Sequence, residues 1–212
     1  MIIEEGNIRI TATFSEDRTH RYSLRREWWD DDSRPTAVII MSHASGADIV
    51  KGDLTTSVLI QNNLAALGYR AVTCCNLFSR ITPDSKLDLA GDVSGFTNEN
   101  NMQVTLQAIR EADVCIIAIG SLSATYKKVA AYQNRLFDLL RDEGFQDKIY
   151  TISAPDGSEQ LHPSSGKLRA AGSWKLVPYE LPTPPPAEKE IADVSIDTDN
   201  TTKSGKSKKS NK

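Results

Sequence analysis

The run Thr36-Ala37-Val38-Ile39-Ile40-Met41 is apolar from its second residue onward. A strand that is buried on both faces has such a continuous apolar run, whereas a strand with one face in water alternates. Three later runs have the same character, namely AVTCC (71–75), DVCIIAIG (113–120) and IYTIS (149–153). The four runs therefore predict four adjacent, parallel strands.

Segments with a helical period lie between these runs. The sequence predicts helices over residues 55–67, 99–112 and 126–143. The apolar face of the first helix would comprise Val58, Leu59, Leu64, Ala65 and Leu67. Because strands and helices alternate along the chain, the predicted fold class is α/β, a three-layer α/β/α sandwich with a mainly parallel four-stranded sheet.

Both ends of this core carry further segments. Residues 7–14 and 20–28 alternate around a polar turn, which predicts an N-terminal β-hairpin, and residues 173–180 could add an edge strand. From Leu181 the composition changes: four of the nine prolines lie between residues 182 and 186, and the last ten residues hold five lysines. We expect one α/β domain over residues 1–180 and a disordered tail over 181–212.

Composition narrows the class of protein. The chain has 212 residues, of which 39% are hydrophobic and 25% are charged, and no apolar run approaches the roughly 20 residues of a membrane span. The N-terminus does not have the pattern of a signal peptide, so we expect a cytoplasmic protein without a membrane partner. The three cysteines show no metal-ligand spacing, and we expect neither a metal nor a cofactor.

The loops after the four strands hold the unusual polar residues. In parallel sheets ligands bind beyond the carboxyl ends of the strands, so these loops are the candidate site. The candidate catalytic residues are Asp48, His162 and His43. The candidate ligand-binding residues are Asn76, Phe78, Asp53, Gly120, Ser121 and Ser164.

Several stretches together resemble the domain-of-unknown-function family numbered 1643. They are RYSLRREWW (21–29), AVIIMSHASGADIVKGDLT (37–55), LGYRAVTCCNLFSRITPDSKL (67–87), ADVCIIAIGS (112–121) and LHPSS (161–165). The matched positions are Ala47, Asp48, Asp53, Thr55, Asn76, Leu77, Phe78, Gly120, His162 and Pro163. The chain departs from the family pattern at His43-Ala44, where an asparagine–proline pair is usual, and at Ile119, where a tryptophan is usual. The family name records no activity.

A weaker resemblance is to the uracil-DNA glycosylase superfamily, whose members use a four-stranded parallel sheet in a three-layer sandwich. It implies that Asn76 reads the edge of a base and that His162 stabilises charge on the departing base. It also implies that Asp48 or His43 positions a water molecule. Such a resemblance predicts a small-molecule ligand that contains a nucleobase.

Three classes of function remain open. The first is an enzyme or binder that acts on a nucleobase-containing ligand, with Asp48, Asn76 and His162 converging on it. A nucleic-acid partner is not supported by charge, because residues 1–180 hold 19 Lys and Arg against 23 Asp and Glu, a net charge of −4. A second class is a hydrolase with Ser42 or Ser45 as nucleophile and a histidine as base, although neither serine lies in a G-x-S-x-G elbow. The third is a non-catalytic interaction or ligand-binding module. The oligomeric state is not decided by the sequence.

Overall fold

The computed structural model describes residues 1–81 and 93–183. The chain divides into two units, Met1–Pro182 and Thr183–Lys212. The predicted tail therefore lies outside the described residues from position 184 onward. Within the described residues, no helix has both the length and the apolar character needed to cross a membrane.

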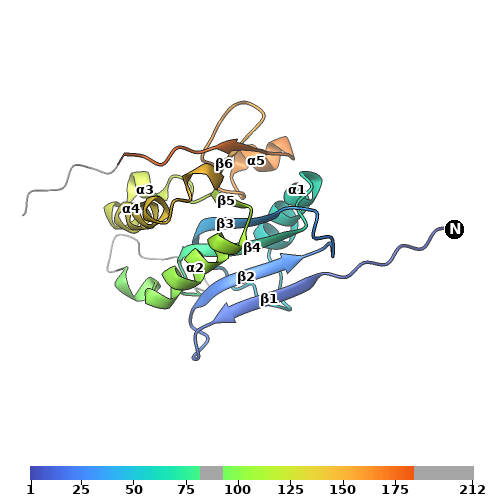
Figure 1. Cartoon of the computed structure of the whole chain (residues 1–212), viewed down its shortest axis with the longest axis horizontal. Helices are drawn as coiled ribbons and strands as arrows, with labels where there is room; N and C mark the ends of the chain where they lie inside the picture. The colour runs from blue at the N-terminus through green and yellow to red at the C-terminus, as the bar shows by residue number, and fades with distance from the viewer. Residues whose placement is uncertain (82–92, 184–212) are drawn as a thin grey trace, which may run out of the picture. The chain divides into compact units, whose positions relative to one another are not determined.

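A mixed sheet of seven strands forms the centre of the first unit, in the order β1-β2-β4-β3-β5-β6-β7 (Figure 1). The strands are β1 (Arg9–Phe14), β2 (Arg21–Glu27), β3 (Thr36–His43), β4 (Ala71–Phe78), β5 (Val114–Ile117), β6 (Ile149–Ser153) and β7 (Lys175–Pro178). The strands β4, β3, β5 and β6 are adjacent and parallel. The prediction of four adjacent parallel strands is confirmed for this centre of the sheet.

The prediction that the sheet has four strands is wrong. The hairpin β1–β2 joins the sheet through antiparallel pairing of β2 with β4, and β7 adds to β6 in the same way. The sheet is therefore larger than four strands and mixed. Continuous apolar runs identify only strands that are buried on both faces, and β1, with alternating exposed and half-buried residues, has no such run.

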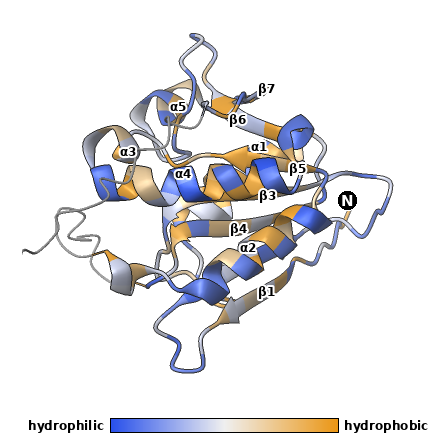
Figure 2. Ribbon diagram, turned by 60° about the vertical axis from the view of Figure 1, so that its left-hand side comes forward, coloured by the Kyte–Doolittle hydropathy of each residue, from blue (hydrophilic) through white to orange (hydrophobic). Residues whose placement is uncertain are grey.

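Helices pack on both faces of the sheet. The α-helices are α1 (Gln61–Ala66), α2 (Glu99–Glu111), α3 (Leu122–Thr125), α4 (Lys127–Asp142) and α5 (Gly166–Ala171), and a π-helix, η1 (Leu54–Ile60), precedes α1. The two short 3-10 turns are η2 (Ser94–Phe96) and η3 (Gln146–Lys148). Figure 2 shows α2 and α4 across one face of the sheet.

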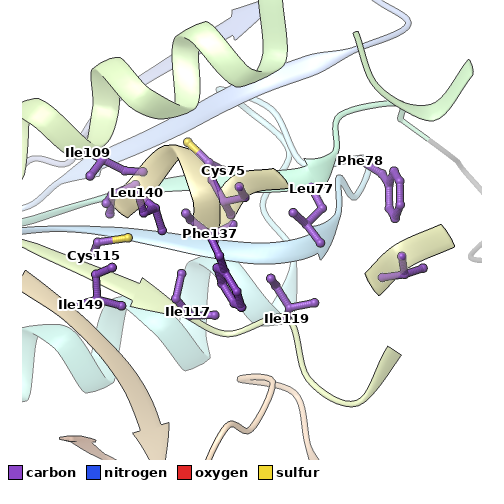
Figure 3. Packing of buried hydrophobic residues seen from close by; sticks show 14 of the residues in the cluster. Cys75, Leu77, Phe78, Ile109, Cys115, Ile117, Ile119, Phe137, Leu140 and Ile149 are labelled. Carbon is purple, nitrogen blue, oxygen red and sulfur yellow. The ribbon is translucent and has the colours of Figure 1, made fainter. Parts of the chain in front are cut away.

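Alternate residues of each central strand enter two separate hydrophobic clusters. Val38 and Ile40 pack with Leu136 and Phe137 of α4 in the cluster of Figure 3. Ala37, Ile39 and Met41 pack on the opposite face, with Ile60, Leu64, Leu168 and Trp174. Since successive side chains of a strand point to opposite faces, the continuous apolar runs serve two cores at once.

The predicted inward face of the first helix is wrong in part, because Leu64 is buried as predicted but Val58 and Leu67 are not. Val58 and Leu67 are 45% and 44% exposed, and the buried residues are Thr56, Ile60 and Leu64. The reason is the π-helical turn over Leu54–Ile60, because hydrogen bonds from residue i to i+5 widen the turn and rotate the following side chains away from an α-helical pattern.

Candidate functional site

The strand order places a topological switch point between β3 and β5. From β3 the chain continues to β4 on one side, and from β5 it continues to β6 on the other. At such a point the two loops part beyond the carboxyl ends of the strands and leave a crevice. His43 ends β3 and Gly120 follows β5, so both lie at this edge of the sheet.

His162 lies in the loop between β6 and α5 and has a defined tautomer. Its Nδ1 accepts a hydrogen bond from the backbone N–H of Ser164 at 3.2 Å, and the Ser164 hydroxyl lies 2.7 Å from the same nitrogen. Burial, and then repulsion from His43, lower the pKa of His162 to about 4. The ring is therefore neutral at pH 7, and the proton is on Nε2 because Nδ1 accepts.

Gly120 brings the loop after β5 against His162. Its φ of +76° lies in the left-handed region, which glycine adopts without a steric penalty. A Cβ atom at this position would lie 3.2 Å from the Cβ of His162 and 3.8 Å from its backbone nitrogen. The close approach of the two loops therefore depends on a residue without a side chain.

A groove of about 420 Å³ lies between these two loops. Its volume is within the range of ligand sites, which runs from roughly 300 to 1,000 Å³. The residues that give it polar character are Ser121, Ser123, Glu159, Gln160, His162 and Ser165. Two of the predicted ligand-binding positions, Gly120 and Ser121, line it together with His162.

His43 is close enough to His162 to influence its titration. The His43 Nδ1 lies 3.0 Å from the Ser42 hydroxyl, and burial lowers the pKa of the ring. Both imidazoles are thus kept neutral mainly by desolvation, which disfavours the charged form.

The Asn76 side chain is part of a buried hydrogen-bond network and does not line the groove. The side chain is 2% exposed, its Nδ2 donates to the carbonyl of His43 at 2.8 Å, and its Oδ1 accepts from Arg21 Nη2 at 3.4 Å. The Asn101 side chain in turn donates to the Asn76 carbonyl at 2.9 Å. Both the oxygen and the nitrogen of the Asn76 side-chain amide therefore have hydrogen-bond partners within the protein.

Asp53 and Asp48 hold the loop between β3 and α1. Asp53 caps η1 by accepting from the Thr56 N–H at 2.7 Å, and it also accepts from the hydroxyl of Ser45. Burial opposes its ionisation, but these hydrogen bonds outweigh burial and lower the pKa of Asp53. Asp48 accepts from the backbone N–H groups of Val50 and Lys51, which lower its pKa, and it does not line the groove.

Phe78 is part of the core. Its ring is fully buried and makes edge contacts with Tyr132 at 5.4 Å and with Phe96 at 6.3 Å between ring centroids. A ligand could reach Phe78 only by displacing these rings. Ser164 acts on the site indirectly, through its hydrogen bonds to His162.

Two residues of this region were not identified from the sequence. Arg21 is polar and lies in an alternating strand, so its pattern indicates a solvated edge, yet it is 1% exposed. Glu159 lies in a polar loop without a motif, and it is the carboxylate that lines the groove. In the described parts of the chain, no group of three His, Cys, Asp or Glu residues is arranged to hold a metal ion.

The serines of the hydrolase alternative have hydrogen-bond partners within the protein. Ser42 is next to an imidazole but buried, and Ser45 bonds to Asp53 and faces Arg21. Neither hydroxyl lines the groove.

Comparison with known proteins identifies the family. No curated protein and no solved structure gives a significant match to the chain. The model of one family, described as "Protein of unknown function (DUF1643)", matches residues 21–164, which is more than half of the chain and includes the segment from β2 to the loop that carries His162. The chain therefore belongs to the DUF1643 family.

Proposed function

We propose that this protein binds a small molecule containing a nucleobase in the groove between the β5–α3 and β6–α5 loops. The observation that carries the proposal is the neutral imidazole of His162, which lines the groove. Its Nδ1 already accepts a hydrogen bond from Ser164, so its Nε2–H is the group that can donate to a ligand. A nucleobase edge offers carbonyl oxygens and ring nitrogens that accept from such a donor. Glu159 supplies an acceptor for base N–H groups.

The position of the groove supports the same proposal. It lies beyond the carboxyl ends of β5 and β6 and next to the switch point, which is where open α/β sheets bind ligands. The net charge of −4 over residues 1–180 disfavours a long nucleic acid, whose phosphates need cationic partners. A free base, nucleoside or nucleotide is therefore the ligand class that we propose.

We extend the proposal to hydrolysis of a glycosidic bond. As the bond breaks, negative charge develops on the base and positive charge on the sugar. A neutral imidazole donating from Nε2 would stabilise the charge on the leaving base. Glu159, the carboxylate of the groove, would stabilise the charge on the sugar and accept a proton from the water molecule whose oxygen bonds to the sugar carbon as the base leaves. The resemblance to the uracil-DNA glycosylase superfamily motivates this extension, because it assigns to His162 the stabilisation of charge on the departing base.

The alternative is a binding module without catalysis. The specific observation in its favour is that the Asn76 amide is buried and bonded at both ends, so that it does not reach the groove as it stands. Under this alternative the groove retains its ligand and releases no product.

Calorimetric titration with the free bases, their nucleosides and the nucleoside 5′-monophosphates tests binding. We expect at least one of these probes to bind, His162→Ala to lose that binding, and His162→Gln, which keeps a side-chain N–H donor, to retain part of it. The matched control is His20→Ala, because His20 also has its Nδ1 next to a serine hydroxyl, that of Ser79 at 2.9 Å, but belongs to the N-terminal hairpin. Absence of binding by every probe, or equal binding by His162→Ala, would contradict the proposal.

Chromatography of the same mixtures separates the two versions of the proposal. Release of a free base from a nucleoside or nucleotide supports glycosidic hydrolysis. Stable binding with no released base supports the binding module.

A further inference from the structure

Arg21 is a buried cation, and no carboxylate of the described residues forms an ion pair with it. It is 1% exposed, and the ion pairs formed within residues 1–81 and 93–183 do not include it. Its Nε is buried without a hydrogen-bond partner. Burying a guanidinium in this way costs free energy, which suggests that its hydrogen bonds have a specific structural role.

The guanidinium joins three segments of the chain. Nη1 donates to the carbonyl of Ala47 at 2.6 Å and to that of Ser45 at 3.3 Å, both in the loop after β3. Nη2 donates to the Oδ1 of Asn76 at the end of β4. Because the donors of a guanidinium are fixed in one plane, these contacts set the loop and the amide relative to each other.

Asn76 connects Arg21 to His43 of the candidate site through hydrogen bonds. A donor on its Oδ1 defines which end of the amide is the oxygen, and so directs Nδ2 to the carbonyl of His43. The Ser45 hydroxyl lies 3.5 Å from Arg21 Nη1 and donates to Asp53, so a serine bridges the cation and the Asp53 carboxylate.

We propose that Arg21 is a positioning residue of the candidate site, which fixes the position of His43 through Asn76 and through the loop after β3. It does not touch a ligand. The assignment concerns the position of His43 and is tested without any ligand, so it stands or falls independently of the proposed function.

The test measures the His43 ring by nitrogen-15 NMR of histidine-labelled full-length protein. We expect Asn76→Ala to release the His43 carbonyl and to let water reach the ring, so that the pKa of His43 rises toward the ordinary histidine value of about 6.5. Arg21→Lys should shift it in the same direction, because an ammonium group does not present the planar set of donors that reaches both the loop after β3 and Asn76. The tautomer of His162 should not change, since Ser164 fixes it from its own loop.

The matched control is Arg26→Met. Arg26 is on the same strand and 8% exposed, but its Nε donates to Gln61 at 2.9 Å and its contacts do not lead to His43. We expect the pKa of His43 to be unchanged in this variant. If Arg21→Lys does not fold, Ser45→Ala tests the same network, because it removes a single hydroxyl from a half-buried loop residue.

An unchanged His43 pKa in folded Asn76→Ala and in either of the other two network variants would overturn the assignment. An equal shift in Arg26→Met would also overturn it, because the effect would then follow from general loosening. A shift of His43 with no binding of any nucleobase probe would support the positioning role and contradict the proposed function.

Discussion

Gly120→Ala tests whether the loop after β5 is built to approach His162. The φ of +76° makes any L residue strained there, at a cost of roughly 1–2 kcal/mol. The added methyl group would also lie 3.2 Å from the Cβ of His162, which is tighter than nine in ten real contacts of a Cβ atom. His162 must therefore move by a few tenths of an ångström, and the groove changes shape.

The control for this variant is Gly144→Ala. Gly144 has nearly the same φ, +73°, but a Cβ atom there would meet nothing within 4 Å, so only the backbone cost applies. Urea unfolding should show a loss of about 1–2 kcal/mol for Gly144→Ala and a larger loss for Gly120→Ala. NMR of the histidine rings should show a change at His162 in Gly120→Ala only.

Equal losses of stability in the two variants, with the His162 signals unchanged in both, would contradict this expectation. The contact between Gly120 and His162 would then have no energetic role, and the groove would not depend on it.

Three further changes test other parts of the account. Phe137→Ala removes a fully buried ring from the cluster under α4, and urea unfolding should show a loss of about 3–5 kcal/mol. The pKa of His162 is lower in the folded protein than in the unfolded chain, so the unfolded chain binds more protons below pH 6.5. The free energy of unfolding should therefore fall as the pH decreases from about 6.5 toward 4, and this fall should be weaker in His162→Gln. Equal pH profiles of the two proteins would contradict the low pKa of His162. Asp48→Ala removes the acceptor of the Val50 and Lys51 backbone amides, so amide hydrogen exchange at these two residues should accelerate. Loss of base release with unchanged amide exchange would instead indicate a catalytic Asp48.

The central strands could be predicted because their signal is local. Val38, Ile39 and Ile40 are apolar in succession, and each is buried on one of two faces. The pairing of β2 with β4 has no such signal, because Leu24 and Cys74 are paired across the sheet but lie 50 positions apart in the sequence. The π-helical turn before α1 cannot be predicted in this way, because its wider turn does not follow the α-helical period that the apolar residues suggest.

The location of the site could be predicted from topology, but its contacts could not. The loops that hold His43, Gly120 and His162 follow parallel strands, and the sheet order then brings them to one edge. The hydrogen bond between Arg21 and Asn76 spans 55 residues, and only the fold reveals that this arginine is buried. The burial of Asn76 and Phe78 likewise depends on α2 and on Tyr132 of α4, which cover the end of β4.

The most direct test of the account is the protonation state of His162 during ligand addition. Nitrogen-15 spectra of the histidine rings at pH 7 should show an unprotonated Nδ1 and a protonated Nε2, because Nδ1 accepts from Ser164. Titration with the nucleoside 5′-monophosphates should then shift the Nε2 resonance of His162 more than that of His20. A charged ring, a proton on Nδ1, or a bound nucleotide that leaves the His162 Nε2 resonance in place would contradict the account.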